Sequence, residues 1–120
     1  MRKQFIYEDN DSAECHFDSL YQKVYLTIDA KDGTSTDNYA ISVFVKINDV
    51  LLDDGWTECA VRKLETNVVS ESIAIVMAAV GRPHTYEILC EYPQAVKITR
   101  TGADLADEFY VIFSPAGVLR

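Results

Sequence analysis

The stretch VSESIAIVMAAVG at residues 69–81 carries apolar residues with the spacing of an amphipathic helix. Its larger side chains recur at i, i+4, i+7, i+8 and i+11, which lines one side of a helix. Alanines favour this helix, Gly81 suits its C-terminal cap, and Pro83 prevents its continuation. A short apolar run is also compatible with a buried strand. Alanine content and length favour the helix, so we expect a central amphipathic helix at about 69–80.

Segments before this stretch alternate apolar and polar residues, the period of half-buried strands. Residues 22–30 and 39–48 show this alternation and are separated by a polar loop. The two segments therefore predict a long antiparallel hairpin, with the helix packed on its apolar face. A tight turn at Asp53, Asp54 and Gly55 leads into a third strand at 56–62.

Residues 85–92, 95–101 and 108–114 predict further strands, the last ending at Pro115. Asp11 and Glu14 stand at capping-box spacing, followed by apolar residues at helical spacing. We therefore expect a short N-terminal helix at about 11–21, with a strand through Cys15 and Phe17 as the alternative. The whole chain, residues 1–120, is predicted to be a single α+β domain with a twisted, mainly antiparallel sheet.

The charge of the chain is strongly acidic and unevenly distributed. Its 19 acidic and 11 basic residues give a formal charge of −8. Residues 1–58 hold 12 acidic and 5 basic residues, whereas residues 59–120 hold 7 and 6. This balance argues against direct nucleic-acid binding, which needs clustered Lys and Arg. It is compatible with steering toward a basic protein, and also with solubility alone.

Cysteine usage and the absence of a long apolar run predict a cytoplasmic domain with no membrane span. Cys15, Cys59 and Cys90 are odd in number and widely spaced, which favours reduced thiols over a disulfide framework. No apolar run approaches the roughly 20 residues that cross a bilayer. The start of the chain lacks the apolar core of a signal peptide.

Catalytic and metal motifs are not evident, so we expect no catalytic residue, no metal and no cofactor. The loop between Asp29 and Asp37 lacks the ligand spacing and final glutamate of a calcium loop. A zinc quartet and a Gly-rich phosphate loop are likewise missing from the sequence. The rival hypothesis is a small enzyme that uses Cys59 or Cys90 with His84.

Aromatic residues on the polar sides of strands predict a binding surface. Tyr25 and Phe44 fall on the two strands expected to pair, and Trp56 follows the tight turn. Exposed aromatic residues ringed by acids mark interaction sites when they are contiguous. A second layer covering this face is the alternative.

The sequence therefore predicts a non-enzymatic acidic module that occludes or escorts a basic protein partner. Its size and acidity are similar to those of small inhibitors, immunity proteins and secretion chaperones. A structural subunit of a larger assembly is a further alternative, and a homodimer is left open. The predicted partner-binding residues are the aromatic anchors and the acids around them: Asp9, Asp11, Glu14, Tyr25, Asp29, Asp32, Asp37, Phe44, Asp53, Asp54 and Trp56.

Overall fold

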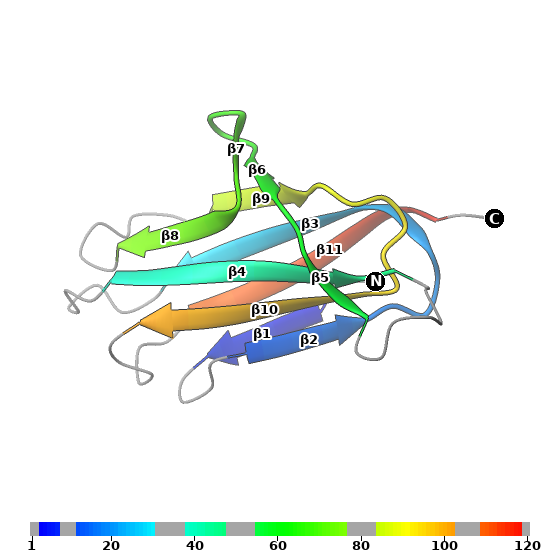
Figure 1. The fold of residues 1–120 in the computed structure, drawn as a ribbon, viewed down its shortest axis with the longest axis horizontal. Helices are drawn as coiled ribbons and strands as arrows, with labels where there is room; N and C mark the ends of the chain where they lie inside the picture. Colours follow the sequence, from blue (N-terminus) through cyan, green and yellow to red (C-terminus); the bar gives the residue numbers. More distant parts are fainter. Residues whose placement is uncertain are drawn as a thin grey trace.

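The computed structural model describes residues 3–7, 12–30, 38–47, 55–76, 84–102 and 109–118. These residues form two antiparallel sheets that pack face to face (Figure 1). The six-stranded sheet has the order β1 (Lys3–Tyr7), β11 (Phe109–Val118), β3 (Tyr21–Ala30), β9 (His84–Ile88), β6 (Val61–Lys63) and β7 (Val68–Ser70). The five-stranded sheet has the order β2 (Ser12–His16), β10 (Ala95–Gly102), β4 (Asn38–Lys46) and β5 (Trp56–Glu58), with β8 (Ser72–Val76) also paired to β4.

The core lies between the two sheets and is filled by alternate residues of their strands. Alternate residues in the middle of β3 and of β4 are buried in one shared cluster: Val24, Leu26, Ile28, Ile41, Val43 and Val45. Residues in between, such as Tyr25 and Phe44, therefore point away from the core on the outer faces. This sandwich replaces the predicted α+β architecture, and the described residues contain no helix.

Most connections carry the chain from one sheet to the other. Among the described strands, only β4–β5 and β6–β7 are consecutive in sequence and hydrogen-bonded to each other. The β6–β7 hairpin stands away from the body of the sandwich at the top of Figure 1. Sequence neighbours are therefore poor guides to sheet neighbours in this fold.

The predicted helix at 69–80 is wrong, because its first part forms two short strands. Val68–Ser70 belongs to the six-stranded sheet and Ser72–Val76 to the five-stranded sheet, with a bend at Glu71. Ile73 is buried opposite Ile41, whereas Val69 is 56% exposed, so the helical side is not formed. The β-branched residues of Ser72–Val76 suit this pairing. Residues 77–80 lie outside the described residues.

The predicted N-terminal helix at 11–21 is also wrong. Ser12–His16 is a strand paired with β10, which is the alternative that the sequence left open. Cys15 is buried, while Glu14 and His16 are exposed, as strand alternation requires. Asp11, the expected cap, lies outside the described residues.

The predicted hairpin of 22–30 and 39–48 is wrong in its pairing, although both segments contain strands. β3 pairs with β11 and β9, whereas β4 pairs with β10, β5 and β8. The seven residues between them are enough to span the roughly 10 Å between packed sheets. Pro115 does not end the last strand either. It pairs with Val24 within β11, two residues beyond Phe113, where the described pairing with β1 ends.

Among the described residues there is no helix of the length and apolarity needed to span a membrane.

Candidate functional site

Aromatic rings and amino groups gather on the outer face of the five-stranded sheet. We call this group the Trp56 cluster; its members come from β2, β4, β5 and β10, and they are His16, Phe44, Lys46, Trp56 and Lys97. The strand register brings them together, because Phe44 lies opposite Lys97, and Lys46 lies opposite Trp56. Segments far apart in the sequence therefore build one surface.

Lys97 is the centre of the cluster. Its Nζ lies 4.8 Å from the ring centroid of Trp56 and 5.2 Å from that of Phe44. Lys46 places its Nζ 6.0 Å from the Trp56 centroid. These distances fall within the range of cation–π attraction. The ammonium of Lys97 therefore holds two rings on one flat face.

His16 lies at the β2 end of the cluster. Its ring meets Trp56 edge to face, with centroids 6.2 Å apart and an interplanar angle of 71°. Its Nε2 lies 3.4 Å from Oε1 of Glu14 on the same strand. The cluster thus spans the sheet from β2 to β5 and has a carboxylate at its rim.

Two small residues allow the long side chains to lie flat on the sheet. Ala95 occupies the row between His16 and Lys46 and is fully buried, although it faces outward by strand alternation. Gly55 precedes Trp56 with φ +70°, and a Cβ there would lie 2.9 Å from Cε of Lys46. Glycine therefore permits both the turn and the path of Lys46.

Phe44 and Trp56 are half-buried, so part of each ring remains accessible on this face. Glu14 and Glu58 are exposed beside them, and Glu58 lies opposite Phe44. Half-buried aromatic rings flanked by charges of both signs are typical of protein contact surfaces. The cluster can contact a partner through ring faces, amino groups and carboxylates.

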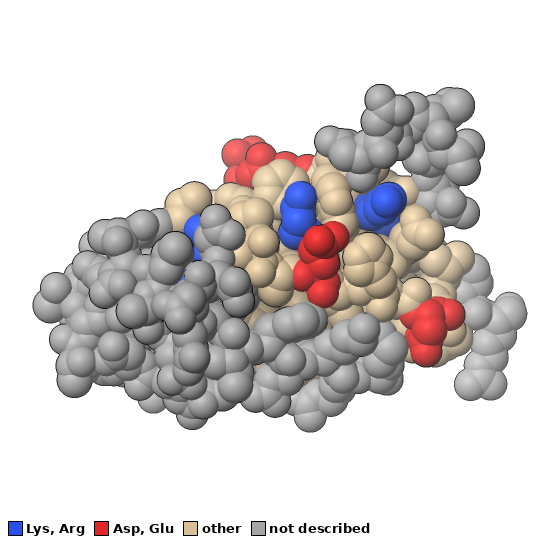
Figure 2. All heavy atoms as spheres, turned by 90° about the horizontal axis from the view of Figure 1, so that it is seen from below, with Lys and Arg blue, Asp and Glu red and all other residues tan. Residues whose placement is uncertain are grey.

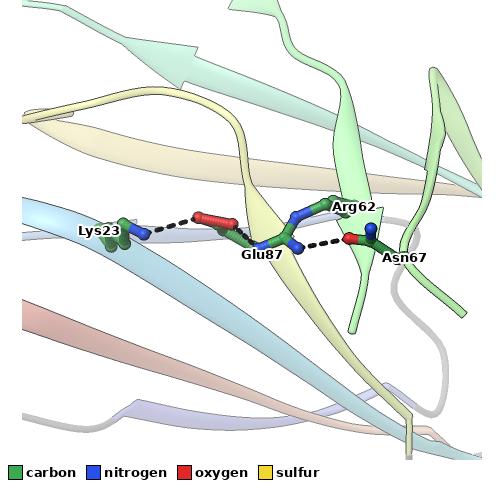
Figure 3. Close-up of polar contacts among 4 residues, drawn as sticks. All are labelled: Lys23, Arg62, Asn67 and Glu87. Atoms are coloured by element: carbon green, nitrogen blue, oxygen red, sulfur yellow. Dashed lines mark hydrogen bonds and ion pairs between the residues drawn. The ribbon is translucent and has the colours of Figure 1, made fainter. Parts of the chain in front are cut away.

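The outer face of the six-stranded sheet carries a different polar group, centred on Glu87 (Figure 3). Oε2 of Glu87 accepts a hydrogen bond from Nη2 of Arg62 at 2.5 Å, and Oε1 lies 3.2 Å from Nζ of Lys23. Nη1 of Arg62 donates to Oδ1 of Asn67 at 2.5 Å. The hydrogen bond from Arg62, aided by Lys23, holds the pKa of Glu87 below its usual value despite burial.

This network has a structural role. It connects β3, β9 and β6 to the β6–β7 turn, where Asn67 adopts φ +60°, a conformation that asparagine tolerates. Glu87 is only 7% exposed, and both of its oxygens are engaged. A carboxylate held in its charged form by two cations is a poor proton acceptor or donor at neutral pH.

The rival thiol enzyme is not supported by the described residues. His84 begins β9 and pairs its Nδ1 with Oε2 of Glu65 at 2.9 Å, while Cys90 lies beyond the other end of β9. Burial, followed by the nearby Cys90, raises the pKa of Cys59 to about 11. Burial also raises the pKa of Cys90. Neutral thiols remote from His84 are weak nucleophiles.

The described residues contain no group of three or more His, Cys, Asp or Glu side chains able to hold a metal ion.

The structure brings together only part of the predicted binding residues. Phe44 and Trp56 belong to the Trp56 cluster, and Glu14 lies beside it. Tyr25 lies on the opposite outer face, between Glu87 and Ser114, because its strand does not pair with that of Phe44 as the sequence predicted. Asp29 is placed in β3 without a described side chain. The remaining predicted acids lie outside the described residues: Asp9, Asp11, Asp32, Asp37, Asp53 and Asp54.

The sequence did not identify His16, Lys46 and Lys97 as members of this surface. Lys46 carries a local signal, since it shares a strand face with Phe44 two residues earlier. Lys97 and His16 carry none, because their places depend on the pairing of β10 with β4 and β2.

The acidic excess of the chain is not concentrated on the described faces. The described side chains include seven acids and six bases. On the face shown in Figure 2, acidic and basic groups are interspersed with uncharged surface. The remaining 12 of the chain's 19 acids therefore account for most of the excess.

No protein-family model matches the chain, and no curated protein matches it in sequence. The similar solved structures include two that share only 10% sequence identity with the chain. The SPBc2 prophage-derived protein YomS has a TM-score of 0.38 and 10% identity, over 95% of this chain and 96% of that one. A turnip yellow mosaic virus structure has a TM-score of 0.39 and 10% identity, over 100% of this chain and 82% of that one.

Proposed function

We propose that this chain is a non-enzymatic module that binds a protein partner through the Trp56 cluster and thereby occludes or escorts that partner. The observation that carries the proposal is the placement of Lys97 over both Phe44 and Trp56. This arrangement fixes two half-buried rings on a flat, accessible face, which lowers the entropy lost when a partner binds. Trp is also among the residues that contribute most to binding energy.

Two features of the chain favour a basic partner, even though the cluster itself carries the ammonium groups of Lys46 and Lys97. A partner arginine can stack on the Trp56 ring in place of Lys97, which exchanges one cation–π contact for another and releases a strongly hydrated ammonium to water. Asp53 and Asp54 directly precede Gly55 and Trp56 in the sequence, and the chain carries a formal charge of −8. These charges favour a cationic partner and accelerate its approach.

We also propose that the protein is cytoplasmic. Its three cysteines are odd in number and widely spaced in the sequence, which is typical of proteins from reducing compartments.

Affinity capture with matched variants tests the proposal. Wild type, Trp56→Ala and Tyr25→Ala are immobilised and exposed to native lysate at low and high salt. We expect a basic protein to be retained by wild type and by Tyr25→Ala, whose substitution lies on the opposite face, and to be lost from Trp56→Ala. Trp56→Phe, which keeps a ring, should retain part of the binding.

Capture must then be reproduced with the purified partner. Circular dichroism of each variant shows whether it is folded, so that lost binding is not confused with lost structure. A partner that Trp56→Ala retains as well as wild type does would contradict the proposal.

A further inference from the structure

Cys59 and Cys90 lie on neighbouring chain segments in matching positions. The β6–β9 ladder pairs Val61 with Ile88 and Arg62 with Glu87. Outward of these pairs the Leu89 N–H donates to the Ala60 carbonyl at 3.1 Å, and Cys59 and Cys90 are the next residues outward on the two segments.

The backbone amides show how the two cysteines are placed. The amide of Leu89 donates to Ala60 at 3.1 Å, whereas the next amide, that of Cys90, donates back to Ile88 at 2.9 Å. The amide of Cys59 donates to Val43 of β4 at 2.8 Å. The two cysteines therefore flank the hydrogen-bonded Ala60–Leu89 row, each where its chain leaves the six-stranded sheet.

The two side chains also reach the same core cluster. Cys59 belongs to the core cluster, and Cys90 packs against it. Cys90 also contributes to the raised pKa of Cys59, in keeping with this placement.

We propose that Cys59 and Cys90 form a reversible intramolecular disulfide. Cys59 lies where the chain passes from β5 in the five-stranded sheet to β6 in the six-stranded sheet, and Cys90 lies where it returns from β9 to β10. The disulfide therefore joins two crossings between the sheets. The proposal does not depend on the binding function of the Trp56 cluster.

The oxidant is a small-molecule disulfide. The Cys90 thiolate, which lines a surface hollow of about 290 Å³, attacks one sulfur of the oxidant. A mixed disulfide forms, the oxidant's S–S bond breaks, and one small thiolate leaves. The Cys59 thiolate then attacks the Cys90 sulfur and displaces the second small thiolate. The two protons lost by the cysteines end on the released thiols, so the protein is oxidised by two electrons and the small disulfide is reduced.

Both thiols have raised pKa values, so the reaction should be slow at neutral pH and should accelerate as pH rises. At equilibrium the disulfide should oppose unfolding, because it restricts the unfolded chain. The oxidised protein should melt about 10 °C higher than the reduced protein.

The test uses the full-length chain in buffers of oxidised and reduced glutathione at pH 8.5. Remaining thiols are alkylated under denaturing conditions, and the products are identified by peptide mass spectrometry. We expect a 59–90 linked peptide in the oxidised wild type, alkylation of Cys15 alone, and full reversal by dithiothreitol. Cys15→Ala should give the same linked peptide, whereas Cys59→Ser should stop at a glutathione adduct on Cys90.

Three results would overturn the proposal. One is a wild-type protein that accumulates a glutathione adduct on Cys90 without the internal disulfide. The second is a linkage involving Cys15. The third is a disulfide that forms only between two chains, seen as a dimer on a non-reducing gel.

Discussion

Lys97 and Trp56 contact each other across the strand that separates them. Lys97 lies on β10 and Trp56 on β5, with β4 between, yet the Lys97 Nζ lies 4.8 Å from the Trp56 ring centroid. The same ammonium lies 5.2 Å from the ring centroid of Phe44 on β4. The rings are therefore positioned by the paired strands and by one cation.

Removing the charge of Lys97 should loosen the ring arrangement. Lys97→Met keeps the hydrocarbon stem and removes the ammonium, so the free energy of unfolding should fall by about 0.5–1 kcal/mol. Trp56 is the chain's single tryptophan, so its emission maximum should shift as well. Urea denaturation and fluorescence measure the two effects. Lys63→Met on the other sheet is the control, and equal behaviour of both variants would contradict this account.

Glu87 should stabilise the fold in a pH-dependent way. Arg62 and Lys23 hold its pKa below the unfolded value of about 4.3, so the stabilisation is complete above that pH. It is lost as pH falls through the lower folded-state pKa. Glu87→Gln should therefore be less stable than wild type by about 1.5–3 kcal/mol at pH 7.

The stability gap between wild type and Glu87→Gln should close below about pH 4. Urea midpoints measured between pH 3 and pH 7 test this trend. Glu71→Gln, at an exposed position, should track wild type throughout. A gap that stays constant with pH would show that the charge of Glu87 is not responsible.

Truncation to alanine should lower the free energy of unfolding strongly at Ile73 and hardly at all at Val69. Ile73 is 2% exposed in the core, so Ile73→Ala should cost about 2–5 kcal/mol. Val69 is 56% exposed at the sheet edge, so Val69→Ala should change stability by less than about 0.5 kcal/mol. Chemical denaturation measures both. Equal large losses would instead favour the helix, in which both residues face the core.

The sequence identified most strands, because strand alternation is a local signal. Residues 22–30 and 39–48 alternate, and Val24, Leu26, Ile28, Ile41, Val43 and Val45 are buried as this pattern predicts, whereas Ile47 is 52% exposed. The stretch at 69–80 was wrongly predicted to be a helix, because Val69 and Ile73 are four residues apart, which is a helical spacing. The chain turns at Glu71 between them, and each part joins a different sheet. That choice is made by tertiary pairing, which overrides local propensity.

Pairing and the binding surface were harder to predict. Tyr25 and Phe44 were expected to be neighbours because their strands are consecutive in the sequence, and they lie on opposite outer faces. Conversely, Lys97 is 53 residues from Phe44 and lies directly opposite it. A sheet-to-sheet crossing leaves no periodicity signal, so a surface assembled across four strands cannot be derived from one segment.

The acidic first half of the chain should affect the rate of partner binding. Neutralising Asp9, Asp11 and Asp37 to Asn together should lower the association rate at low salt and change dissociation little. The effect should fade as salt rises, since the screening length is about 8 Å at physiological ionic strength. Stopped-flow kinetics measure it. The control is a matched triple neutralisation in the second half of the chain, at Glu71, Asp104 and Asp107.

Equal slowing by the two triple variants would mean that the asymmetry of charge serves solubility alone.

The dissociation rate of the captured partner tests the binding surface most directly. Surface plasmon resonance compares wild type, Trp56→Ala and Tyr25→Ala, each shown to be folded. We predict that Trp56→Ala dissociates at least about 30-fold faster, as expected for the loss of a hot spot worth 2 kcal/mol or more, while Tyr25→Ala matches wild type. Unchanged dissociation of Trp56→Ala, or equal acceleration in both variants, would contradict binding through the Trp56 cluster.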